Sequence, residues 1–436
     1  MIKGGIVVNA HHQEVADVYV EDGIIVLVQS KIKVGDYVIV IDAMGKYVMP
    51  GDIDPHTHLG MEFMGSETID DCYSGQVAAL ARGTTMYIDF ALPINGSLSA
   101  GFDAYTKKAR MACMDYGFHI AVTKWDEVVS RDMEILVKEK GINSFKFFLS
   151  YKDSFMINDE LLLKGSKKCK TLGVVPMVHA ENGDAVSEGQ KRIFDFGITG
   201  PEGHGLSRPP MLEGEATSRA IHLASFVNVP LYVVHVMSID AMEEIAKAQK
   251  SGQEVVGEAV VSGLVFDDSA LWDPDFTIAS KYVMSPPIRE AGHCKALQAA
   301  LSTGILKLVG TDHCTFNSTQ KALGIGDFKI IPNGVNGSDV NIIILNPNAS
   351  FKILSSSHHS RSDINVYEGR KGKGKVEVKI AGGKFAWENG ELKVEPGSGK
   401  YTEMPPFGHL FSGIGKADAA YLSSLRAPVH RVRSAT

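Results

Sequence analysis

The feature that most constrains the fold is an alternation, through the middle of the chain, between short apolar runs and amphipathic segments. Eight apolar runs follow one another, at 53–58, 84–90, 119–124, 144–149, 174–180, 231–236, 255–260 and 306–312. Strands that alternate with helices form parallel sheets, and eight repeats are typical of a (β/α)8 barrel rather than an open doubly wound sheet. We therefore expect an α/β protein built on a TIM-type barrel.

Helices are predicted between most of these runs. The clearest are 131–140, with Ser130 as its cap, 212–226, 294–303, and a helix that ends at Gly252 and begins with a capping-box-like pair, Asp240 and Glu243. A complete barrel also needs a helix after its eighth strand. There the only helical stretch is 318–323, and the glycines and proline that follow disfavour a longer one. The sequence thus predicts a barrel without its eighth helix.

Both ends of the chain are rich in predicted strands. The first strands are expected at 3–10, 18–28 and 37–41, with Asp22-Gly23 as a hairpin turn inside the second run. Further strands are expected at 341–345, 376–380, 385–387 and 392–394, with turns at 382–383 and 389–390. We therefore predict one small β-sandwich domain from residues 1–48 and 338–400, a barrel from 49–337, and an extended tail from 401–436.

Composition excludes several classes of protein. The 436 residues carry a net charge of −7 without a long block of like charge, which argues against an extended nucleic-acid surface. No apolar run approaches the roughly 18 residues of a membrane span, and the first residues do not resemble a secretory leader. Five scattered cysteines without a C-x-x-C pair indicate a reducing compartment. We expect a cytoplasmic protein that uses a small-molecule substrate and neither nucleic acid nor membrane.

The sharpest motif is Asp-Pro-His-Thr-His at 54–58, at the end of the first barrel strand. Histidines two residues apart on a strand project from the same face, so His56 and His58 can bind one ion. Three other strands end in possible ligands, His179, His235 and Asp312. Because the carboxyl ends of barrel strands meet at one face, all five side chains are expected at one barrel mouth. They exceed what one tetrahedral zinc needs, which indicates two ions.

The fourth predicted strand carries Lys146 among phenylalanines. Burial disfavours the charged ammonium and lowers the pKa of a lysine. A neutral amine beside two cations can add CO2 to become a carbamate, which is an anion able to bridge them. The spacing alone leaves open whether Lys146 does so or points its amine to solvent.

These features resemble the cyclic-amidohydrolase superfamily, and within it the hydantoinase/dihydropyrimidinase family, whose plant members have the most similar tail. The resemblance covers nearly the whole chain and rests on the stretches 51–58, 145–152, 178–183, 282–289 and 310–314. It implies hydrolytic ring opening of 5,6-dihydrouracil or dihydrothymine to N-carbamoyl-β-amino acids, in pyrimidine catabolism, by a hydroxide bound to two zinc ions. It also implies a homotetramer in which the tail reaches a neighbouring subunit.

The resemblance implies a centre of two Zn²⁺ ions per subunit. Six residues would be its ligands: His56, His58, Lys146, His179, His235 and Asp312. The first two histidines and the aspartate would bind one ion, and the other two histidines would bind the second. The lysine, as N6-carboxylysine, would bridge both ions.

The resemblance also assigns roles in catalysis and substrate binding. Asp312 would carry a proton from the bridging water to the leaving nitrogen, and Tyr151 would donate a hydrogen bond to the oxyanion of the tetrahedral intermediate. Ser285 and Asn333 would hold the imide edge of the ring through backbone groups. The wall around the substituent of the ring would consist of Met61, Phe148 and Phe155.

The chain departs from the pattern of the family after Gly337. Members of the family carry two further helices and a strand there, whereas this chain continues directly with Ser338-Asp339. The gap coincides with the missing eighth helix, and it would expose apolar surface at a cost of about 25 cal/mol per Å². Every expected ligand precedes the gap, so the chemistry is still encoded.

Two alternatives remain open at this point. The same site could open another cyclic amide, as in a hydantoinase or an allantoinase. The chain could also be a non-catalytic scaffold, because some relatives of the family have lost metal ligands and act as assembly proteins of the cytoskeleton. The complete set of ligands weighs against a scaffold, whereas the missing segment weighs for it.

Overall fold

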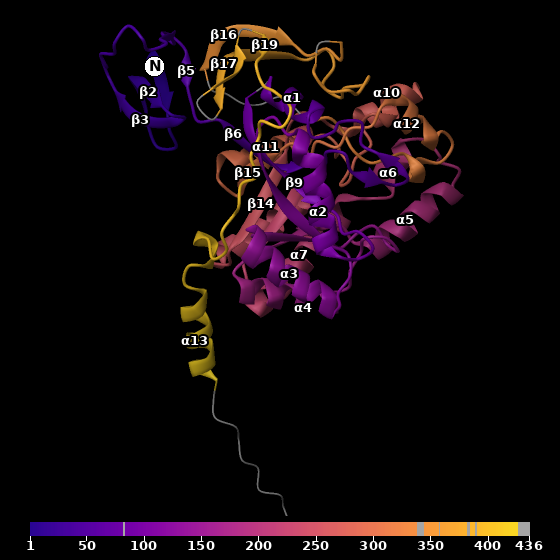
Figure 1. Ribbon diagram of the computed structural model, residues 1–436. Coiled ribbons are helices and arrows are strands. Elements are labelled where there is room, and N and C mark those ends of the chain that lie inside the picture. The colour runs from indigo at the N-terminus through magenta and orange to yellow at the C-terminus, as the bar shows by residue number, and fades with distance from the viewer. Residues whose placement is uncertain (82, 338–343, 357, 382–383, 389, 426–436) are drawn as a thin grey trace, which may run out of the picture.

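A computed structural model describes residues 1–436 except 82, 338–343, 357, 382–383, 389 and 426–436. Eight parallel strands form a nearly closed barrel, and a β-rich domain lies at one end of it (Figure 1). The barrel strands are β6 (Asp52–Thr57), β9 (Thr84–Ala91), β10 (Asp115–Val122), β11 (Ser144–Phe148), β12 (Val175–His179), β13 (Leu231–Val236), β14 (Val255–Val260) and β15 (Leu306–Gly310). Their order in the sheet is their order in the chain. The predicted barrel is confirmed.

Helices cover the outside of the barrel. The longer ones are α1 (Ser74–Leu80), α2 (Leu98–Lys108), α3 (Glu127–Lys140), α4 (Asp159–Leu172), α5 (Gly183–Asp195), α7 (Pro210–Val227), α8 (Ile239–Lys250) and α11 (His293–Ser302). Shorter ones are α6 (Glu202–Leu206), α9 (Val261–Val265), α10 (Phe276–Ser280) and α12 (Ser318–Lys321). Two predicted caps are wrong. Asp126 caps α3 in place of Ser130, and Ser238 caps α8 in place of Asp240, because each lies where the chain is still extended and accepts a hydrogen bond from the first turn.

The pairing of the described barrel strands is interrupted where the last strand meets the first. In the described residues between β15 and β16, the longest α-helix is the four-residue α12 (Ser318–Lys321), as the missing eighth helix requires. No continuous ladder joins β15 to β6 in the described sheet order. Individual hydrogen bonds connect the two strands instead. The amide of His58 donates to the carbonyl of His313 at 2.8 Å, and the amide of Thr311 donates to Asp54 Oδ1 at 3.1 Å.

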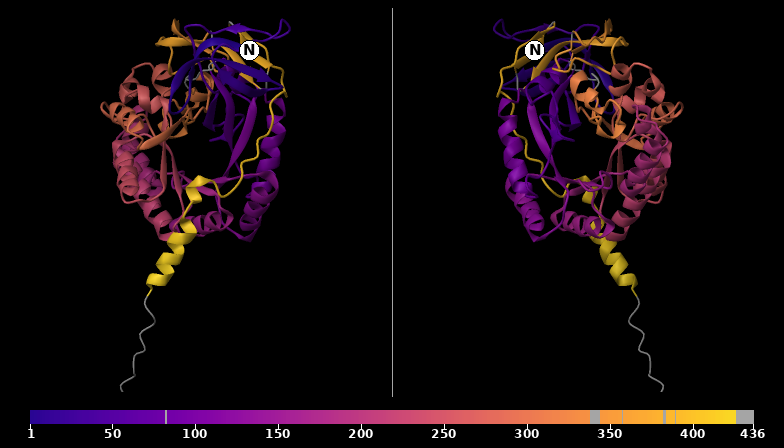
Figure 2. Two further views of the ribbon diagram at one scale, coloured as in Figure 1. Left: turned by 90° about the vertical axis from the view of Figure 1, so that its left-hand side faces the viewer. Right: turned by 90° about the vertical axis from the view of Figure 1, so that its right-hand side faces the viewer.

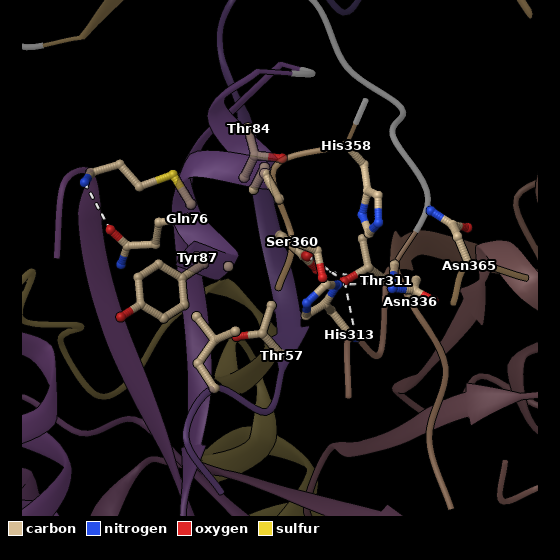
Figure 3. A pocket seen from close by; sticks show the side chains of 17 residues that line it. Thr57, Gln76, Thr84, Tyr87, Thr311, His313, Asn336, His358, Ser360 and Asn365 are labelled. Carbon is tan, nitrogen blue, oxygen red and sulfur yellow. Dashed lines mark hydrogen bonds between the residues drawn. The ribbon is translucent and has the colours of Figure 1, made fainter. Parts of the chain in front are cut away.

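A cavity lies at this seam (Figure 3). Its described walls include Thr57 on β6, Gln76 on α1, Tyr87 on β9, and His313 and Asn336 in the loops that follow β15. None of the six predicted metal ligands is among these described lining residues. The described lining of the cavity is therefore separate from the predicted site.

Strands from both ends of the chain form the β-rich domain. They are β1 (Ile2–Val8), β2 (Gln13–Glu21), β3 (Ile24–Gln29), β4 (Ile41–Asp42), β5 (Tyr47–Val48), β16 (Ile344–Lys352), β17 (Lys371–Ala381), β18 (Lys384–Glu388) and β19 (Glu391–Leu392). They belong to one branched sheet, which β5 and β16 join by antiparallel pairing. A strand at 37–41 was expected, but only β4 forms there. The strand predicted at 341–345 and the two predicted turns fall in part on 341–343, 382–383 and 389, which lie outside the described residues.

The remaining elements lie near the barrel mouth and along the tail. A small hairpin, β7 (Glu62–Phe63) and β8 (Ser66–Glu67), follows β6. The tail contains α13 (Ile414–Ser424), which corrects the expectation of an extended segment; alanine, leucine and lysine in this stretch favour a helix. Asp418 anchors α13 by accepting a hydrogen bond from Lys170 at 2.8 Å. Figure 2 shows α13 at the end of the barrel opposite the β-rich domain.

The inside of the barrel is packed beneath the predicted site. Phe90, Met177 and Val234, from three different strands, form a buried apolar cluster there. Such a floor holds the strand ends rigidly, because close-packed side chains cannot shift without opening voids. Within the described part of the chain, no helix is both long and apolar enough to cross a membrane.

Candidate metal centre

The ends of five barrel strands bring the six predicted ligands together. All six side chains belong to buried residues, each at most 8% exposed: His56, His58, Lys146, His179, His235 and Asp312. His56 lies on β6 and His58 directly follows this strand, whereas the others belong to β11, β12, β13 and the residues after β15. Because charged and polar groups are rarely buried without a partner, a cluster of this kind indicates a site rather than a core.

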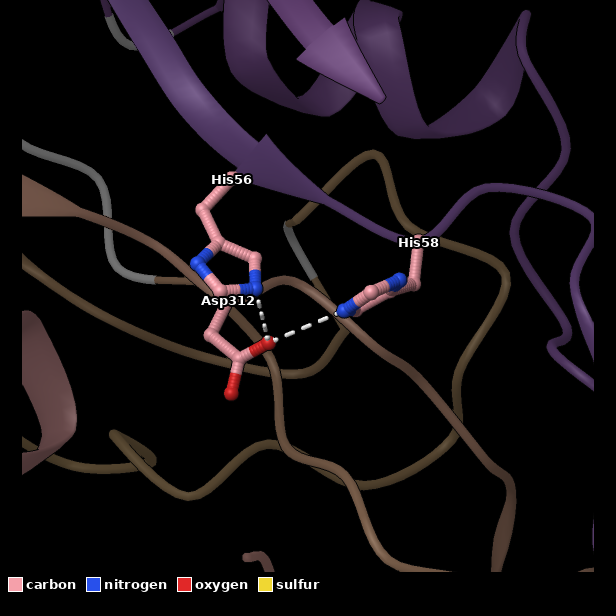
Figure 4. Close-up of side chains that lie close together, drawn as sticks. All are labelled: His56, His58 and Asp312. Carbon is pink, nitrogen blue, oxygen red and sulfur yellow. Dashed lines mark ion pairs between the residues drawn. The ribbon is translucent and has the colours of Figure 1, made fainter. Parts of the chain in front are cut away.

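Three of these residues form a compact group (Figure 4). Oδ1 of Asp312 lies 3.2 Å from Nε2 of His56 and 3.3 Å from Nε2 of His58. One potential ligand atom from each of the three lies within 4.8 Å of the others. Two imidazoles and a carboxylate at such separations can bind one metal ion.

The other three residues lie beside this group. The ring centres of His179 and His235 are 4.5 Å apart, and the ring of His235 is 5.4 Å from that of His56. Nζ of Lys146 lies 3.3 Å from Nε2 of His56. The lysine amine therefore lies within reach of the first group, and His235 places the second pair of histidines beside it.

Aromatic rings surround the amine of Lys146. Nζ lies 4.1 Å from the ring centre of Phe90 and 5.2 Å from that of Phe148. Burial lowers the pKa of Lys146 to about 8, although Asp312 and Glu258 act in the opposite direction. Burial thus raises the fraction of neutral amine above that of an ordinary lysine, and the neutral amine is the form that reacts with CO2.

Two buried glutamates that the sequence analysis missed orient the histidines. Oε1 of Glu258 lies 2.7 Å from Nδ1 of His56, and Oε2 of Glu181 lies 2.8 Å from Nε2 of His179. A carboxylate on one ring nitrogen fixes the ring and leaves the other nitrogen for a metal. One signal was present: Glu258 interrupts the apolar run 255–260, and a charge inside a fully buried strand needs a partner.

The residues present fit a metal centre. Nδ1 of His235 is buried and has no hydrogen-bond partner among the described residues. A buried polar atom left without a partner costs about 1–3 kcal/mol, so a bound ion or water would relieve a real penalty here. Imidazole and carboxylate donors are also the set that zinc prefers.

Three predicted site residues have left-handed backbones. The φ angles are 61° at Tyr151, 38° at His235 and 50° at Asp312. A non-glycine residue in this region is strained by about 1–3 kcal/mol and persists only where its surroundings demand it. At Tyr151 the demand is visible, because its carbonyl accepts hydrogen bonds from the amides of Ser154, Phe155 and Met156. With these backbone conformations, all three residues line the cavity at the barrel mouth.

The predicted substrate residues line the same cavity as the ligands. Its walls include all six of them: Met61, Phe148, Tyr151, Phe155, Ser285 and Asn333. Phe63 of β7 also lines this cavity, and the sequence analysis did not identify it. Burial, together with the nearby charge of Glu181, raises the pKa of Tyr151, so its hydroxyl keeps its proton and can donate a hydrogen bond.

Comparison with known proteins places this geometry in a family. Residues 47–341, more than half of the chain, match the sequence pattern of the Amidohydrolase family. The chain belongs to the amidohydrolase family. This amidohydrolase is 69% identical to a protein from Arabidopsis thaliana named dihydropyrimidinase, over all of this chain and 91% of that one.

Solved structures resemble this amidohydrolase closely. The crystal structure of a dihydropyrimidinase from Brevibacillus agri has a TM-score of 0.90 at 36% identity and covers 94% of this chain and 99% of its own. A crystal structure of a D-hydantoinase has a TM-score of 0.90 at 36% identity, with 93% and 99% covered. The alignment with the Arabidopsis protein has 481 positions, which is 45 more than this chain has residues, as a chain lacking a segment requires.

Proposed function

We propose that this amidohydrolase hydrolyses the ring of 5,6-dihydrouracil and 5,6-dihydrothymine to N-carbamoyl-β-amino acids, a step of pyrimidine catabolism. The observation that carries the proposal is the convergence of four histidines, one lysine and one aspartate on a single barrel mouth. The same chain is 69% identical to a protein named dihydropyrimidinase. An amide carbonyl resists attack by water, so an enzyme of this kind needs both a stronger nucleophile and a polarised carbonyl.

Two Zn²⁺ ions are the proposed cofactors. His56, His58 and Asp312 would hold one ion, and His179 and His235 would hold the other. When bound, the ions lower the pKa of water towards about 7 and polarise the amide carbonyl. This role fits the donor set and the unpartnered Nδ1 of His235.

Lys146 is proposed to be carboxylated. Its neutral Nζ forms a bond to the carbon of CO2 and loses one proton, which leaves a carbamate with two oxygen atoms and one negative charge. Burial supports this step, because it lowers the pKa of the amine to about 8 and so raises the fraction that is unprotonated. The carbamate would offset the repulsion between two cations held in one small site.

The remaining steps belong to residues of this chain. The carboxylate of Asp312 would accept the proton of the attacking water and release it to the leaving ring nitrogen. The hydroxyl of Tyr151 would donate to the oxyanion that develops at the attacked carbonyl. Backbone groups of Ser285 and Asn333 would bind the alternating C=O and N–H groups of the imide. The apolar wall would then contact the substituent of the ring through Met61, Phe148 and Phe155.

Turnover of dihydrouracil by the purified protein with zinc tests this function. We expect N-carbamoyl-β-alanine as the product, and loss of activity and of about half or more of the bound zinc in Lys146→Ala. Lys138→Ala is the matched control, because Lys138 is exposed on α3. Full activity of Lys146→Ala would contradict the bridged two-metal centre.

A second cyclic amide is the main competing substrate class. The D-hydantoinase structure and the Brevibacillus dihydropyrimidinase structure match this chain with the same TM-score of 0.90. Comparing kcat/KM for dihydrouracil, hydantoin and allantoin separates these activities. A non-catalytic scaffold would instead bind no zinc, whereas the proposed enzyme binds about two ions per chain.

We also propose a homotetramer in the cytoplasm. Exposed apolar side chains on and just after α13, Tyr421, Leu422 and Leu425, are 53–65% exposed in the single chain and support contact with another subunit. Light scattering of the purified chain and of a variant ending at residue 400 tests the assembly. Imaging of a fluorescent fusion in cells tests the location.

A further inference from the structure

A lysine outside the metal centre is buried with unusual partners. Lys321, the last residue of α12, is 1% exposed. Its Nζ donates hydrogen bonds to the carbonyl oxygens of Val283 at 2.9 Å, Pro332 at 2.6 Å and Gly334 at 2.8 Å. An ammonium has three donors, and here each of them reaches a backbone carbonyl.

These three carbonyls belong to the two loops that carry the predicted imide-binding residues. Val283 lies two residues before Ser285, whereas Pro332 and Gly334 flank Asn333. Both Ser285 and Asn333 line the cavity of the metal centre. The amide of Gly334 also donates to the carbonyl of Val283 at 3.0 Å, so one oxygen accepts from both the second loop and Lys321.

Among the described residues, the charge of Lys321 has no acidic partner. In the described part of the chain, no carboxylate oxygen lies within 4.0 Å of its Nζ. Burial lowers the pKa of Lys321 to about 7. An apolar side chain would fill this space without that cost of desolvation, whereas only an ammonium offers three donors to the three carbonyls. The three hydrogen bonds of Lys321 therefore hold the two loops at a fixed distance from each other.

We propose that Lys321 is a positioning residue for substrate binding, because it fixes the separation of the Ser285 and Asn333 loops that hold the imide edge. It touches neither substrate nor metal and acts only through the backbone of these loops. This role depends on the proposed function, since it requires a cyclic imide as the substrate. Loss of the contact weakens ground state and transition state alike, so it raises KM and leaves kcat nearly unchanged.

The test compares three variants of the full chain loaded with zinc. Lys321→Met removes all three donors at similar length, and Lys321→Gln keeps an amide with two donors. Lys295→Met is the control, because Lys295 is exposed on α11. Each variant is measured for zinc content, for thermal unfolding, and for kcat and KM with dihydrouracil. Lys321→Gln is the variant to be judged if Lys321→Met does not fold.

We expect zinc content to match the wild type in every folded variant. KM should rise by about tenfold or more in Lys321→Met and by less in Lys321→Gln, with kcat within about threefold of the wild type. An unchanged KM in both, or a fall in kcat together with loss of zinc, would overturn the positioning role. If the wild-type protein does not open dihydrouracil, both the proposed function and the role of Lys321 are refuted. If the wild type is active and the variants keep its KM, only the role of Lys321 is refuted.

Discussion

Glu258 and His56 form the closest contact between a carboxylate and a predicted metal ligand in the described site, with Oε1 2.7 Å from Nδ1. The same Oε1 accepts the backbone amide of His235 at 3.0 Å. A single oxygen thus orients one ligand through its ring and another through its backbone. Both ligands depend on a strand, β14, that supplies no ligand of its own.

Replacement of Glu258 should therefore weaken metal binding. In Glu258→Gln the amide keeps the shape of the side chain but lacks the negative charge, so we expect zinc affinity to fall by about 10- to 100-fold. Competition with a chelator, followed by metal analysis, measures this. Glu254→Gln, at an exposed position just before β14, is the control. Equal zinc retention in both variants would show that Glu258 does not orient the ligands.

Tyr151→Phe should reduce turnover without loss of metal. The hydroxyl is predicted to stabilise charge that develops only in the transition state, and removal of such a donor costs about 10²- to 10³-fold in kcat. Steady-state kinetics and zinc analysis of the same preparation test this. Tyr37→Phe, at an 88% exposed position, serves as the control. A variant that keeps its kcat would require another donor for the oxyanion.

Asp70→Asn should lower stability by about 1–3 kcal/mol. Asp70 accepts hydrogen bonds from His313 at 2.9 Å, Thr315 at 2.9 Å and the amide of Arg361 at 2.8 Å, and so ties the loop around residue 360 to the barrel mouth. Urea unfolding of the variant measures the loss. The exposed Asp195, substituted to Asn, is the control. A free energy of unfolding equal to that of the control would argue against this anchoring role.

The same carboxylate predicts a dependence of stability on pH. Burial acts to raise the pKa of Asp70. The hydrogen bond and charge of His313, the hydroxyl of Ser360 and the backbone amide of Arg361 outweigh it and hold this pKa well below its usual value. A group with a depressed pKa in the folded state stabilises the fold above its unfolded pKa of about 3.9, and this stability is lost as the pH falls through the folded value. The free energy of unfolding should therefore fall below about pH 4, and less steeply in Asp70→Asn.

Lys379→Met should loosen the contact between the β-rich domain and the barrel. Lys379 of β17 is fully buried, and its Nζ donates to the carbonyls of Ala79 at 3.4 Å and Thr84 at 3.3 Å, and to that of Leu80, where α1 ends. We expect a loss of about 1–3 kcal/mol, because the substitution leaves buried carbonyls without donors. Differential scanning calorimetry measures it. Lys375→Met, at an exposed position on the same strand, should unfold like the wild type.

Much of the barrel could be predicted because its signals are local. The runs at 231–236 and 255–260 coincide with β13 and β14, and the other six barrel strands were found within a few residues of their bounds. Five of the six expected ligands were proposed for the same reason, since a histidine or aspartate at the end of an apolar run needs no knowledge of distant residues. The assignment of Lys146 came from the resemblance to the family. The proposed domain boundaries and site roles remain predictions.

What the sequence did not reveal depends on long-range contacts. Lys321 and Lys379 are ordinary lysines in the sequence, and only the fold brings backbone carbonyls from distant segments around each amine. Glu181 follows a predicted ligand by two residues, yet its bond to His179 requires the turn after β12. The prediction of the α3 cap failed for a different reason. Asp126 and Ser130 are both favourable cap residues, and α3 begins after Asp126 because the backbone is still extended there.

The seam between β6 and β15 gives the metal centre a second role. His56 and His58 lie on one side of the seam and Asp312 lies on the other. An ion bound by all three would therefore connect the first and last strands of the barrel. A chelator would then do more than silence the enzyme. It would also remove the link between β6 and β15, which no continuous ladder joins in the described sheet order. Resistance to heat and to proteases would then increase when zinc is bound and decrease when it is removed.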